Sequence, residues 1–443
     1  MDTLPQARQG NSLFGKLIAI VCIMGVCFVA SLAVLVLEMD RSQRADEAIE
    51  EITSKWSREQ IIHGPVITVP VRRLITTNAG QQTVQEDLLI LLPNTLRYDA
   101  TLEAETRSRG IFDAVVYTSK IKGSGTFDMG DLDLGQVDGV IQWDNAKLFI
   151  GIPDTRGIES SAELHWNEEK HAFEPGIPVA IGGASGIHAP VRIQQNKKEH
   201  SFSFDISLRG SQGMHFVPLG KTTDISLSSN WPLPSFTGEF LPDERDLAET
   251  GFTAKWTVSS FGRSLPQSWV DSSTTVNKTI RENIEKSTFG VSLLQEVNFY
   301  TEVDRAVKYS ILFIVLTFLT FFMFEILSHL RIHPLNYLLI GLAIALFYVL
   351  LLSLSEHIGF LAAYSVSTLA ITGLITGYSR SVLGAKKRAG IIAVLLVALY
   401  SYLYILLQLD ELSLVFGSVF LFGILAIVMY ITRDIDWYSI SER

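Results

Sequence analysis

Two long apolar runs with a short segment between them constrain this chain more than any other feature. They cover residues 309–327 and 335–354, and each is about as long as the ~20 residues that a helix needs to cross a bilayer. Only the segment SHLRIHP (328–334) lies between them. The sequence therefore predicts two membrane-spanning helices that form a tight hairpin.

Four further apolar runs give six predicted spans. They cover residues 17–37, 359–378, 390–409 and 412–431. The first run is longer than the ~7–15 apolar residues usual for a signal peptide, so we interpret it as an uncleaved anchor. The predicted fold is an α-helical integral membrane protein with six transmembrane helices and a large β-rich domain inserted between helices 1 and 2.

The predicted boundaries follow from these runs. They are an N-terminal segment 1–16, span 17–37, an inserted domain 38–306 that starts with a helix over 38–62, a five-helix bundle 307–431 and a tail 432–443.

Basic residues in the short loops predict the orientation, because cytoplasmic loops carry an excess of Lys and Arg. Loop 379–389 contains Arg380, Lys386, Lys387 and Arg388, whereas loops 355–358 and 410–411 contain no Lys or Arg. We therefore expect both termini in the cytoplasm and residues 38–306 on the far side. That side is the periplasm if the membrane is the inner membrane of a Gram-negative bacterium.

The inserted segment has the pattern of a β domain. Short β-branched or alternating runs separated by Gly, Pro, Asn and Asp predict strands in an antiparallel sheet, sandwich or barrel. These runs cover residues 66–76, 87–93, 113–123, 147–153, 191–196, 201–210 and 223–230.

The composition of the inserted segment limits its partners. Residues 38–306 contain 26 basic and 38 acidic side chains, and such an acidic surface repels nucleic acid and anionic headgroups. The only two cysteines, Cys22 and Cys27, lie in the first apolar run, so no disulfide framework is expected in the β domain. We predict the lipid bilayer as a partner, with envelope proteins or lipids as further partners, and no nucleic acid.

An aromatic-rich segment over 231–269 is a candidate interaction surface. The residues named for it are Trp231, Phe236, Phe240, Phe252 and Trp256, and Phe261 and Trp269 follow in the same segment. One interpretation places these rings in the core and in a lid on the sheet. The other makes them a groove or a membrane-interface surface.

Polar residues at the ends of the spans form a second candidate site. Asp304 and Arg305 precede the second span, and Glu356 and His357 end the third on the same side. A carboxylate beside an imidazole can perform acid–base chemistry or sense pH, but such groups also cap helices or dock domains. Glu325, near the other end of the second span, is within reach of Arg331.

Motifs for catalysis or cofactors are not evident. The sequence has no P-loop, GxGxxG or zinc-type cysteine pair, and His329 and His333 lack an evident third ligand. We predict no catalytic, cofactor or metal site. Gly373 and Gly377 form a GxxxG motif, which is typical of close helix packing.

Several blocks resemble the bacterial CreD family of inner-membrane, cell envelope integrity proteins. They include HGPVITVPV (63–71), GIPDTRGI (151–158), GFTAKW (251–256) and RDIDWY (433–438). The segments 229–242, 304–325 and 333–360 are also similar to that family. The resemblance implies a multi-pass inner-membrane protein associated with envelope integrity and envelope-stress responses, and it carries over no catalytic residues.

Three functions remain open from the sequence. The first is non-enzymatic interaction with envelope proteins or lipids. The alternative is a lipid or small-molecule transporter or channel gated by the β domain, with a polar path that includes Tyr364, Thr372, Thr376, Tyr400 and Tyr404. The third is a membrane enzyme that uses Glu356 and His357.

Overall fold

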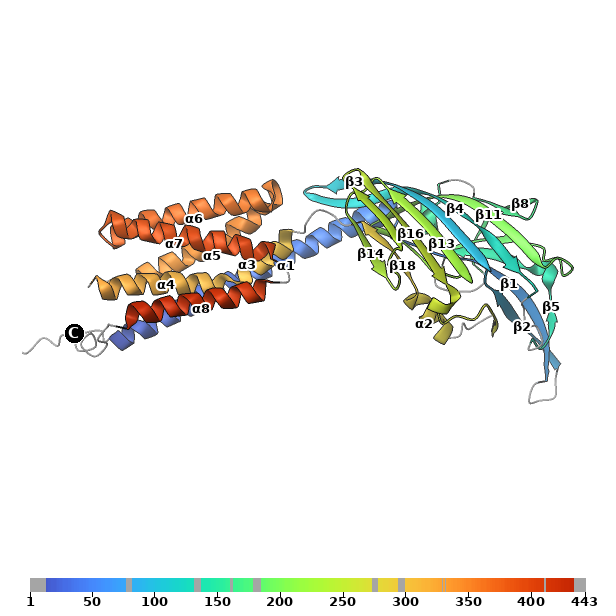
Figure 1. Ribbon diagram of the computed structural model, residues 1–443, viewed down its shortest axis with the longest axis horizontal. Coiled ribbons are helices and arrows are strands. Elements are labelled where there is room, and N and C mark those ends of the chain that lie inside the picture. Colours follow the sequence, from blue (N-terminus) through green and yellow to red (C-terminus); the bar gives the residue numbers. More distant parts are fainter. Residues whose placement is uncertain are drawn as a thin grey trace, which may run out of the picture. The chain divides into compact units, whose positions relative to one another are not determined.

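The chain divides into two compact units. The computed structural model describes residues 13–76, 82–130, 137–159, 162–177, 185–272, 278–293, 299–328, 330, 332–409 and 412–433. One unit comprises Met1–Ala45 and Val297–Arg443, and the other comprises Asp46–Glu296 (Figure 1). We call the first the membrane unit and the second the β unit.

Long helices build the membrane unit. They are α1 (Leu13–Trp56), whose residues after Ala45 belong to the β unit, α4 (Ser310–Leu327), α5 (Pro334–Ile358), α6 (Phe360–Val382), α7 (Lys386–Gln408) and α8 (Ser413–Thr432), with the shorter α3 (Phe299–Lys308) before α4. Among the described residues, these six long helices have the length and apolar composition needed to cross a membrane. The predicted six-span fold with an inserted β-rich domain is confirmed.

Local sequence signals set the helix boundaries. Pro334 occupies the first turn of α5, where its missing N–H costs nothing, and the His333 side chain before it accepts a hydrogen bond from the Leu335 N–H. Gly359, with φ of 75°, ends α5 and leads directly into α6.

The first helix differs from its prediction. A single helix of 44 residues, α1, replaces the predicted span 17–37 with a second helix over 38–62. It ends at Trp56, and β1 (Gln60–Thr76) already includes Ile61 and Ile62, which pair in parallel with β12 (Gly213–Phe216). This long-range pairing overrides the helical pattern, so His63-Gly64-Pro65 lies inside a strand and does not end a helix.

Two sheets build the β unit. The ten-stranded sheet runs in the order β14-β18-β12-β1-β6-β10-β9, with β2 and β5 also paired to β1, and β17 paired to β2. The eight-stranded sheet runs in the order β15-β16-β13-β3-β4-β11-β7-β8. Most pairs are antiparallel, but β1 with β12 and β13 with β3 are parallel.

The bounds of the remaining elements are as follows. The ten-stranded sheet includes β2 (Gln82–Leu91), β5 (Val140–Ile141), β6 (Lys147–Gly151), β9 (Glu174–Pro175), β10 (Gly186–Pro190), β14 (Pro234–Gly238), β17 (Ser268–Ser272) and β18 (Phe289–Leu293). The eight-stranded sheet consists of β3 (Thr95–Arg109), β4 (Phe112–Asp128), β7 (Glu163–Trp166), β8 (Glu169–Ala172), β11 (Glu199–Ser211), β13 (Thr222–Ser229), β15 (Glu244–Ala248) and β16 (Gly251–Ser259). The helical segments are α2 (Lys278–Lys286), η2 (Trp143–Asn145), η3 (Thr155–Gly157) and η4 (Ser260–Gly262).

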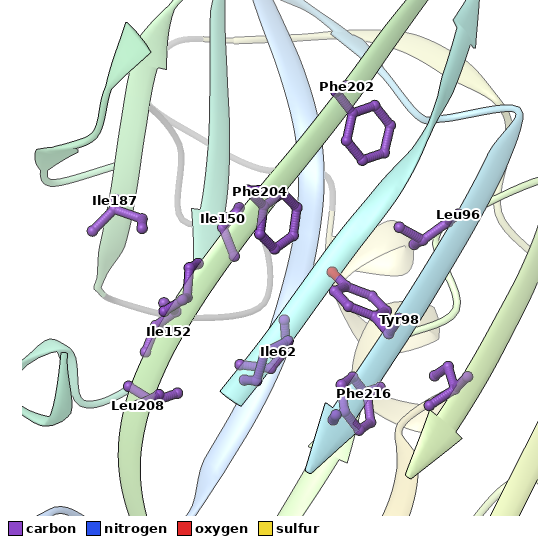
Figure 2. Close-up of a cluster of buried hydrophobic side chains, with 14 of the residues drawn as sticks. Ile62, Leu96, Tyr98, Ile150, Ile152, Ile187, Phe202, Phe204, Leu208 and Phe216 are labelled. Atoms are coloured by element: carbon purple, nitrogen blue, oxygen red, sulfur yellow. The ribbon is translucent and has the colours of Figure 1, made fainter. Parts of the chain in front are cut away.

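One hydrophobic core lies between the two sheets. Alternate residues of β3 are buried, as expected for a strand with one face in the core. The ring of Tyr98 on β3 lies 5.2 Å from that of Phe216 on β12, so the two sheets meet through these side chains (Figure 2). Gly123 leaves room for the Phe204 ring, because a Cβ there would overlap it.

Six of the seven predicted strand runs coincide with strands. The exception is 191–196, which forms no strand. Its Val191 N–H donates to the Ala146 carbonyl, and Gln194 and Lys197 close a turn. Its alternating composition indicated a strand, but the segment lacks a strand partner on either side.

Candidate functional site

The aromatic segment mostly enters the core of the β unit. Phe252 and Trp256 on β16 are 3% and 1% exposed. The Phe236 ring packs edge-on against both, with centroid distances of 5.9 and 5.8 Å. Trp231, Phe236 and Phe240 are half-buried against the same core. Contact by Phe252 or Trp256 with a partner is therefore blocked in this fold, and an interaction surface remains a prediction for the other three.

An exposed apolar tip lies beside these rings. Phe261 on η4 is 99% exposed and Leu241 is 71% exposed. The backbone of Gly262 lies against the Phe240 ring, so the two loops meet there. We call Phe240, Leu241 and Phe261 the Phe261 tip. A fully exposed phenylalanine held at a short helical turn marks this tip as the accessible part of the aromatic segment.

The four polar residues at the helix ends all belong to the membrane unit and have different partners there. Asp304 pairs with Lys308 at 2.6 Å. The Arg305 guanidinium donates to the carbonyls of Leu406 and Leu409, both at 3.3 Å, at the C-terminal end of α7. Arg305 therefore satisfies carbonyls that a helix end leaves without intrahelical partners.

Glu356 and His357 have different partners. The Glu356 carboxylate accepts a hydrogen bond of 3.2 Å from the Tyr300 phenol and lies 3.8 Å from the Arg41 guanidinium. The exposed His357 ring lies 3.1 Å from the Ser353 carbonyl of its own helix. The structure thus makes Glu356 a meeting point of α1, α3 and α5, and it does not join Glu356 to His357.

A half-buried carboxylate lies near the end of α4. Glu325 forms an ion pair with Lys16 of α1 and accepts hydrogen bonds from the Tyr337 hydroxyl and the Ile332 N–H, at 3.1 and 3.3 Å. Arg331, the partner considered from the sequence, lies outside the described residues, as does His329. Three donors around one carboxylate are the arrangement expected for a charge buried at a membrane interface.

Hydroxyl groups gather inside the helix bundle. The Tyr364 hydroxyl donates to the Tyr400 carbonyl at 2.6 Å, and the Tyr404 ring lies 5.5 Å from that of Tyr364. Within the described part of the chain, the buried hydroxyls of Tyr348, Tyr400, Thr372 and Thr376 have no protein hydrogen-bond partner. Four of the five path residues named from the sequence therefore carry buried oxygens, and Tyr404 is half-buried.

Other hydroxyls in the same bundle behave differently. Ser355, Ser365 and Ser379 each donate to the carbonyl four residues earlier, at 2.6–2.8 Å. That bond is the usual way for a helix to satisfy a hydroxyl in lipid. The Thr372 and Tyr400 hydroxyls differ from these serines, because they have no such hydrogen bond to their own helix.

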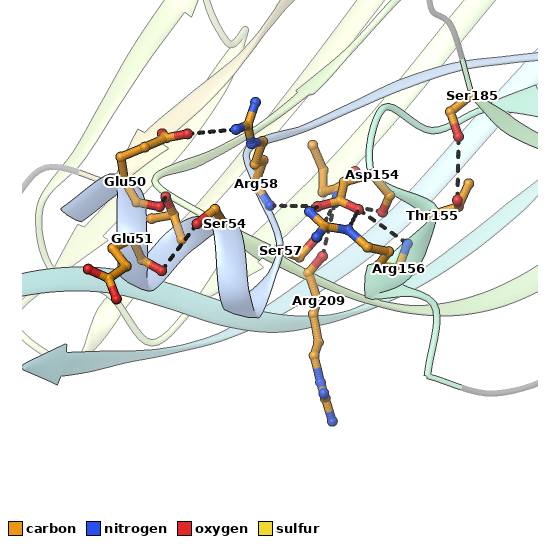
Figure 3. Close-up of polar contacts among 12 residues, drawn as sticks. Glu50, Glu51, Ser54, Ser57, Arg58, Asp154, Thr155, Arg156, Ser185 and Arg209 are labelled. Carbon is orange, nitrogen blue, oxygen red and sulfur yellow. Dashed lines mark hydrogen bonds and ion pairs between the residues drawn. The ribbon is translucent and has the colours of Figure 1, made fainter. Parts of the chain in front are cut away.

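Asp154 organises the point where β1 begins. Its carboxylate accepts from the Arg58 N–H at 3.2 Å and from the Arg156 guanidinium at 2.8 Å (Figure 3). The hydrogen-bonded Arg156 guanidinium lowers the pKa of Asp154 to about 2. Nearby, the Gln60 amide donates to the Asp154 and Arg209 carbonyls, at 3.2 and 3.1 Å.

Trp56, the last residue of α1, is anchored in the same region. Its ring is flanked by the Arg107 and Arg209 guanidinium groups, at 3.7 and 4.5 Å from the ring centroid, and its Nε1 donates to the Tyr117 carbonyl at 3.3 Å. Cation–π contacts of this kind hold an aromatic ring in place on a polar sheet face. Sequence reasoning missed this anchor, although Asp154 and Arg156 lie in the GIPDTRGI block.

Comparisons with known proteins agree with this architecture. The family model described as inner membrane protein CreD matches residues 12–438. The inner membrane protein CreD of Escherichia coli (strain K12) is 33% identical over 413 residues, which cover 92% of this chain and 89% of that protein. A crystal structure of an M1 zinc metallopeptidase from Deinococcus radiodurans matches with a TM-score of 0.19 and 8% identity, over 41% of this chain and 42% of that one. The chain therefore belongs to the family of inner membrane protein CreD.

Proposed function

We propose that this multi-pass inner-membrane protein presents its β unit to the periplasm and there contributes to cell envelope integrity and stress response by binding an envelope protein, without catalysis. The observation that carries the proposal is the insertion of the β unit, Asp46–Glu296, between the first apolar helix and the remaining five. An even number of spans places both termini on one side.

The charge at the helix ends supports the orientation. Arg380, Lys386, Lys387 and Arg388 lie at the α6–α7 connection, whereas the α5–α6 connection carries Glu356 and His357. Since basic loops stay in the cytoplasm, α6 ends on the cytoplasmic side and α5 on the periplasmic side. Counting back through α4 to α1 gives a periplasmic β unit.

Cysteine labelling in intact cells tests this orientation. Ile358→Cys and Ser381→Cys introduce thiols at two exposed positions, one at the end of α5, just before α6, and one near the end of α6. We expect an impermeant maleimide to label Ile358→Cys alone, above the background of the parent chain, whose Cys22 and Cys27 lie within an apolar helix. Labelling of Ser381→Cys alone would reverse the topology and remove the basis of the proposal.

The Phe261 tip is the surface we propose for binding. Phe261 and Leu241 expose apolar side chains that a water-soluble domain has no structural reason to display together. The exposed carboxylates of Glu239 and Asp243 flank Leu241, and they would repel anionic lipid headgroups. An envelope protein with an apolar, non-acidic contact surface therefore suits the tip better than a lipid does.

A complementation experiment tests the binding surface. In cells that lack the native protein, Leu241→Ser/Phe261→Ser should reduce resistance of the envelope to a permeability dye while the amount of membrane-inserted protein stays unchanged. Leu74→Ser is the matched control, because Leu74 is a 70% exposed apolar residue on β1. Equal dye exclusion by the tip variant and the parent would rule out this surface.

The hydroxyl groups inside the bundle favour a second candidate function. Buried hydroxyls that neither pair with protein nor bond their own helix are costly in a membrane and suit an uncharged polar solute. Tyr400, Tyr348 and Thr372 come from α7, α5 and α6, so hydroxyls that can bond such a solute lie on three helices.

Solute uptake tests that candidate. Proteoliposomes that contain the protein should swell faster in glycerol than empty vesicles, and Tyr400→Phe or Thr372→Val should slow swelling. Ser379→Ala removes a hydroxyl that is already bonded to Ile375 and should not change it. Swelling no faster than that of empty vesicles would exclude the passage.

A further inference from the structure

A pocket on the β unit is lined by none of the residues of the Phe261 tip. It has a volume of about 470 Å³ and opens beside η2. Its apolar lining comes from Ile141, Trp143 and Ile193, and its polar lining from Gln142, Asp144, Asn145 and Gln195. A volume of this size lies in the range of small-molecule sites, about 300–1,000 Å³.

Hydrogen bonds to main-chain carbonyls hold both walls of the pocket. The Gln142 N–H donates to the Pro70 carbonyl at 2.8 Å, and the Asn145 N–H donates to the Gln142 carbonyl at 3.0 Å. On the other wall, the Trp166 Nε1 donates to the Arg192 carbonyl at 3.0 Å. The pocket is therefore formed before any ligand arrives, which lowers the entropic cost of binding.

The walls combine a flat ring with primary amides. Trp143 is half-buried, so part of its indole is fixed against the core and the rest faces outward. Gln142, Asn145 and Gln195 each carry an amide that both donates and accepts, and the Asn145 amide uses one donor on the Gln142 amide at 3.0 Å. Asp144 is the only charged residue of the lining, and its carboxylate disfavours phosphate and carboxylate ligands.

We propose that this pocket binds an N-acetylated hexosamine unit of an envelope glycan. The C–H face of a pyranose ring packs on an aromatic face, and its hydroxyls exchange hydrogen bonds with side-chain amides. The acetamido group adds one donor, one acceptor and a methyl group. The side-chain amides of the pocket lining match the donor and the acceptor of the acetamido group. Ile141 and Ile193 offer apolar surface for its methyl group.

This assignment rests on the proposed periplasmic position of the β unit, because that position would give the pocket access to glycans. The glycan strands of a bacterial cell wall and the carbohydrate of outer-membrane lipids both contain acylated amino sugars. The shared chemistry is the uncharged acylamino pyranose, and the test distinguishes the two sources.

Ligand-observed NMR on the full-length protein in lipid nanodiscs tests the proposal, with triacetylchitotriose as the probe. We expect saturable binding that Trp143→Ala weakens at least about tenfold, equivalent to a loss of about 1.4 kcal/mol. Gln195→Leu should weaken it by a similar factor. Gln194→Leu is the matched control, because Gln194 is also exposed but does not line the pocket.

Two results would overturn the assignment. Absence of saturable binding, or equal binding by the parent, Trp143→Ala and Gln195→Leu, would remove the site. Cellotriose has the same rings without acetamido groups, and we expect it to bind at least about tenfold more weakly. Equal affinity for cellotriose would overturn the acetamido part of the assignment.

Two further probes identify the source. Both probes are N-acetylated. Tighter binding of the disaccharide of the cell-wall strand than of the N-acetylated glucosamine disaccharide that matches the outer-membrane lipid assigns the pocket to the cell wall, and the reverse order assigns it to the outer membrane. Failure of the pocket is distinguishable from failure of the proposed function. Loss of sugar binding leaves the topology and the Phe261 tip intact, whereas a cytoplasmic β unit would remove the proposed function but not binding in nanodiscs.

Discussion

The phenol of Tyr300 donates a hydrogen bond to the carboxylate of Glu356, and this contact joins α3 to the C-terminal end of α5. Only 6% of the Glu356 side chain is exposed, and the Arg41 guanidinium of α1 lies 3.8 Å from it. Burial and the nearby Glu356 carboxylate raise the pKa of Tyr300, so the phenol stays protonated and remains a donor at neutral pH. One carboxylate thus fastens three helices.

Replacing Glu356 with Ala should destabilise the membrane unit. Removal of the carboxylate leaves the buried Tyr300 hydroxyl and Arg41 without this acceptor, which costs about 1–3 kcal/mol. We expect a lower thermal unfolding midpoint of the detergent-solubilised protein, measured by helical circular dichroism. His357→Ala serves as the control, because His357 is exposed and bonds only its own helix. Equal midpoints for Glu356→Ala and the parent would reject the fastening role.

Asp154→Asn should destabilise the β unit. The carboxylate is buried, its pKa is held at about 2 by Arg156, and the unfolded value is near 3.8. Because the pKa is lower in the folded state, the ionised Asp154 carboxylate stabilises the β unit above about pH 4, and this stabilisation is lost as the pH falls toward 2. At pH 7 the substitution should therefore cost about 2 kcal/mol.

Denaturant unfolding of the full-length protein, followed by tryptophan fluorescence, measures this change. Asp205→Asn is the control, since Asp205 is an exposed carboxylate on β11. Unfolding of Asp154→Asn at the parent's denaturant concentration would show that Asp154 contributes nothing to the free energy of unfolding.

The spans could be predicted because the information is local: each apolar run is long enough to cross a bilayer by itself. The polar contacts that pack the spans are not local. Lys16 and Glu325 are 309 positions apart, and Tyr300 and Glu356 are 56 apart, so no spacing in the sequence brings them together. Only the fold brings these pairs together.

The burial of Phe252 and Trp256 could have been predicted from the alternation of apolar residues along β16. Phe252, Ala254, Trp256 and Val258 alternate along β16, and all four are buried. A period of two indicates one buried strand face, so it favours core positions for Phe252 and Trp256. The Trp143 pocket had no such signal, because Trp143 and Gln195 lie on segments whose proximity only the sheet establishes.

His63 should make the stability of the β unit depend on pH. Burial lowers the pKa of His63 from 6.5 to about 4, against the opposing charge of Glu285. Between pH 4 and 6.5 the unfolded chain then binds more protons than the folded chain. The stability that depends on neutral His63 is therefore fully present above pH 6.5 and is lost as the pH falls toward 4. The total change is at most about 3 kcal/mol.

Denaturant unfolding at pH 7.5 and pH 5.0 checks this expectation. His63→Leu removes the titrating group, so the difference in the free energy of unfolding between the two pH values should shrink relative to the parent. Comparison of the variant with the parent removes the contributions of other groups, including the buried His200, whose pKa burial also lowers. An unchanged difference would show that His63 does not titrate in this range.

Close packing between α1 and α5 depends on Gly341, a glycine that the sequence did not single out, and this dependence can be tested. A Cβ at Gly341 would overlap Cys27 of α1 and approach the Phe318 ring, so only glycine lets these helices approach. The predicted GxxxG glycines Gly373 and Gly377 have open space around them instead. Gly341→Ala should therefore lower the thermal midpoint of the membrane unit. Gly373→Ala should raise it slightly, because alanine favours a helix by up to about 1 kcal/mol over glycine. An unchanged or raised midpoint for Gly341→Ala would show that the α1–α5 contact tolerates a side chain.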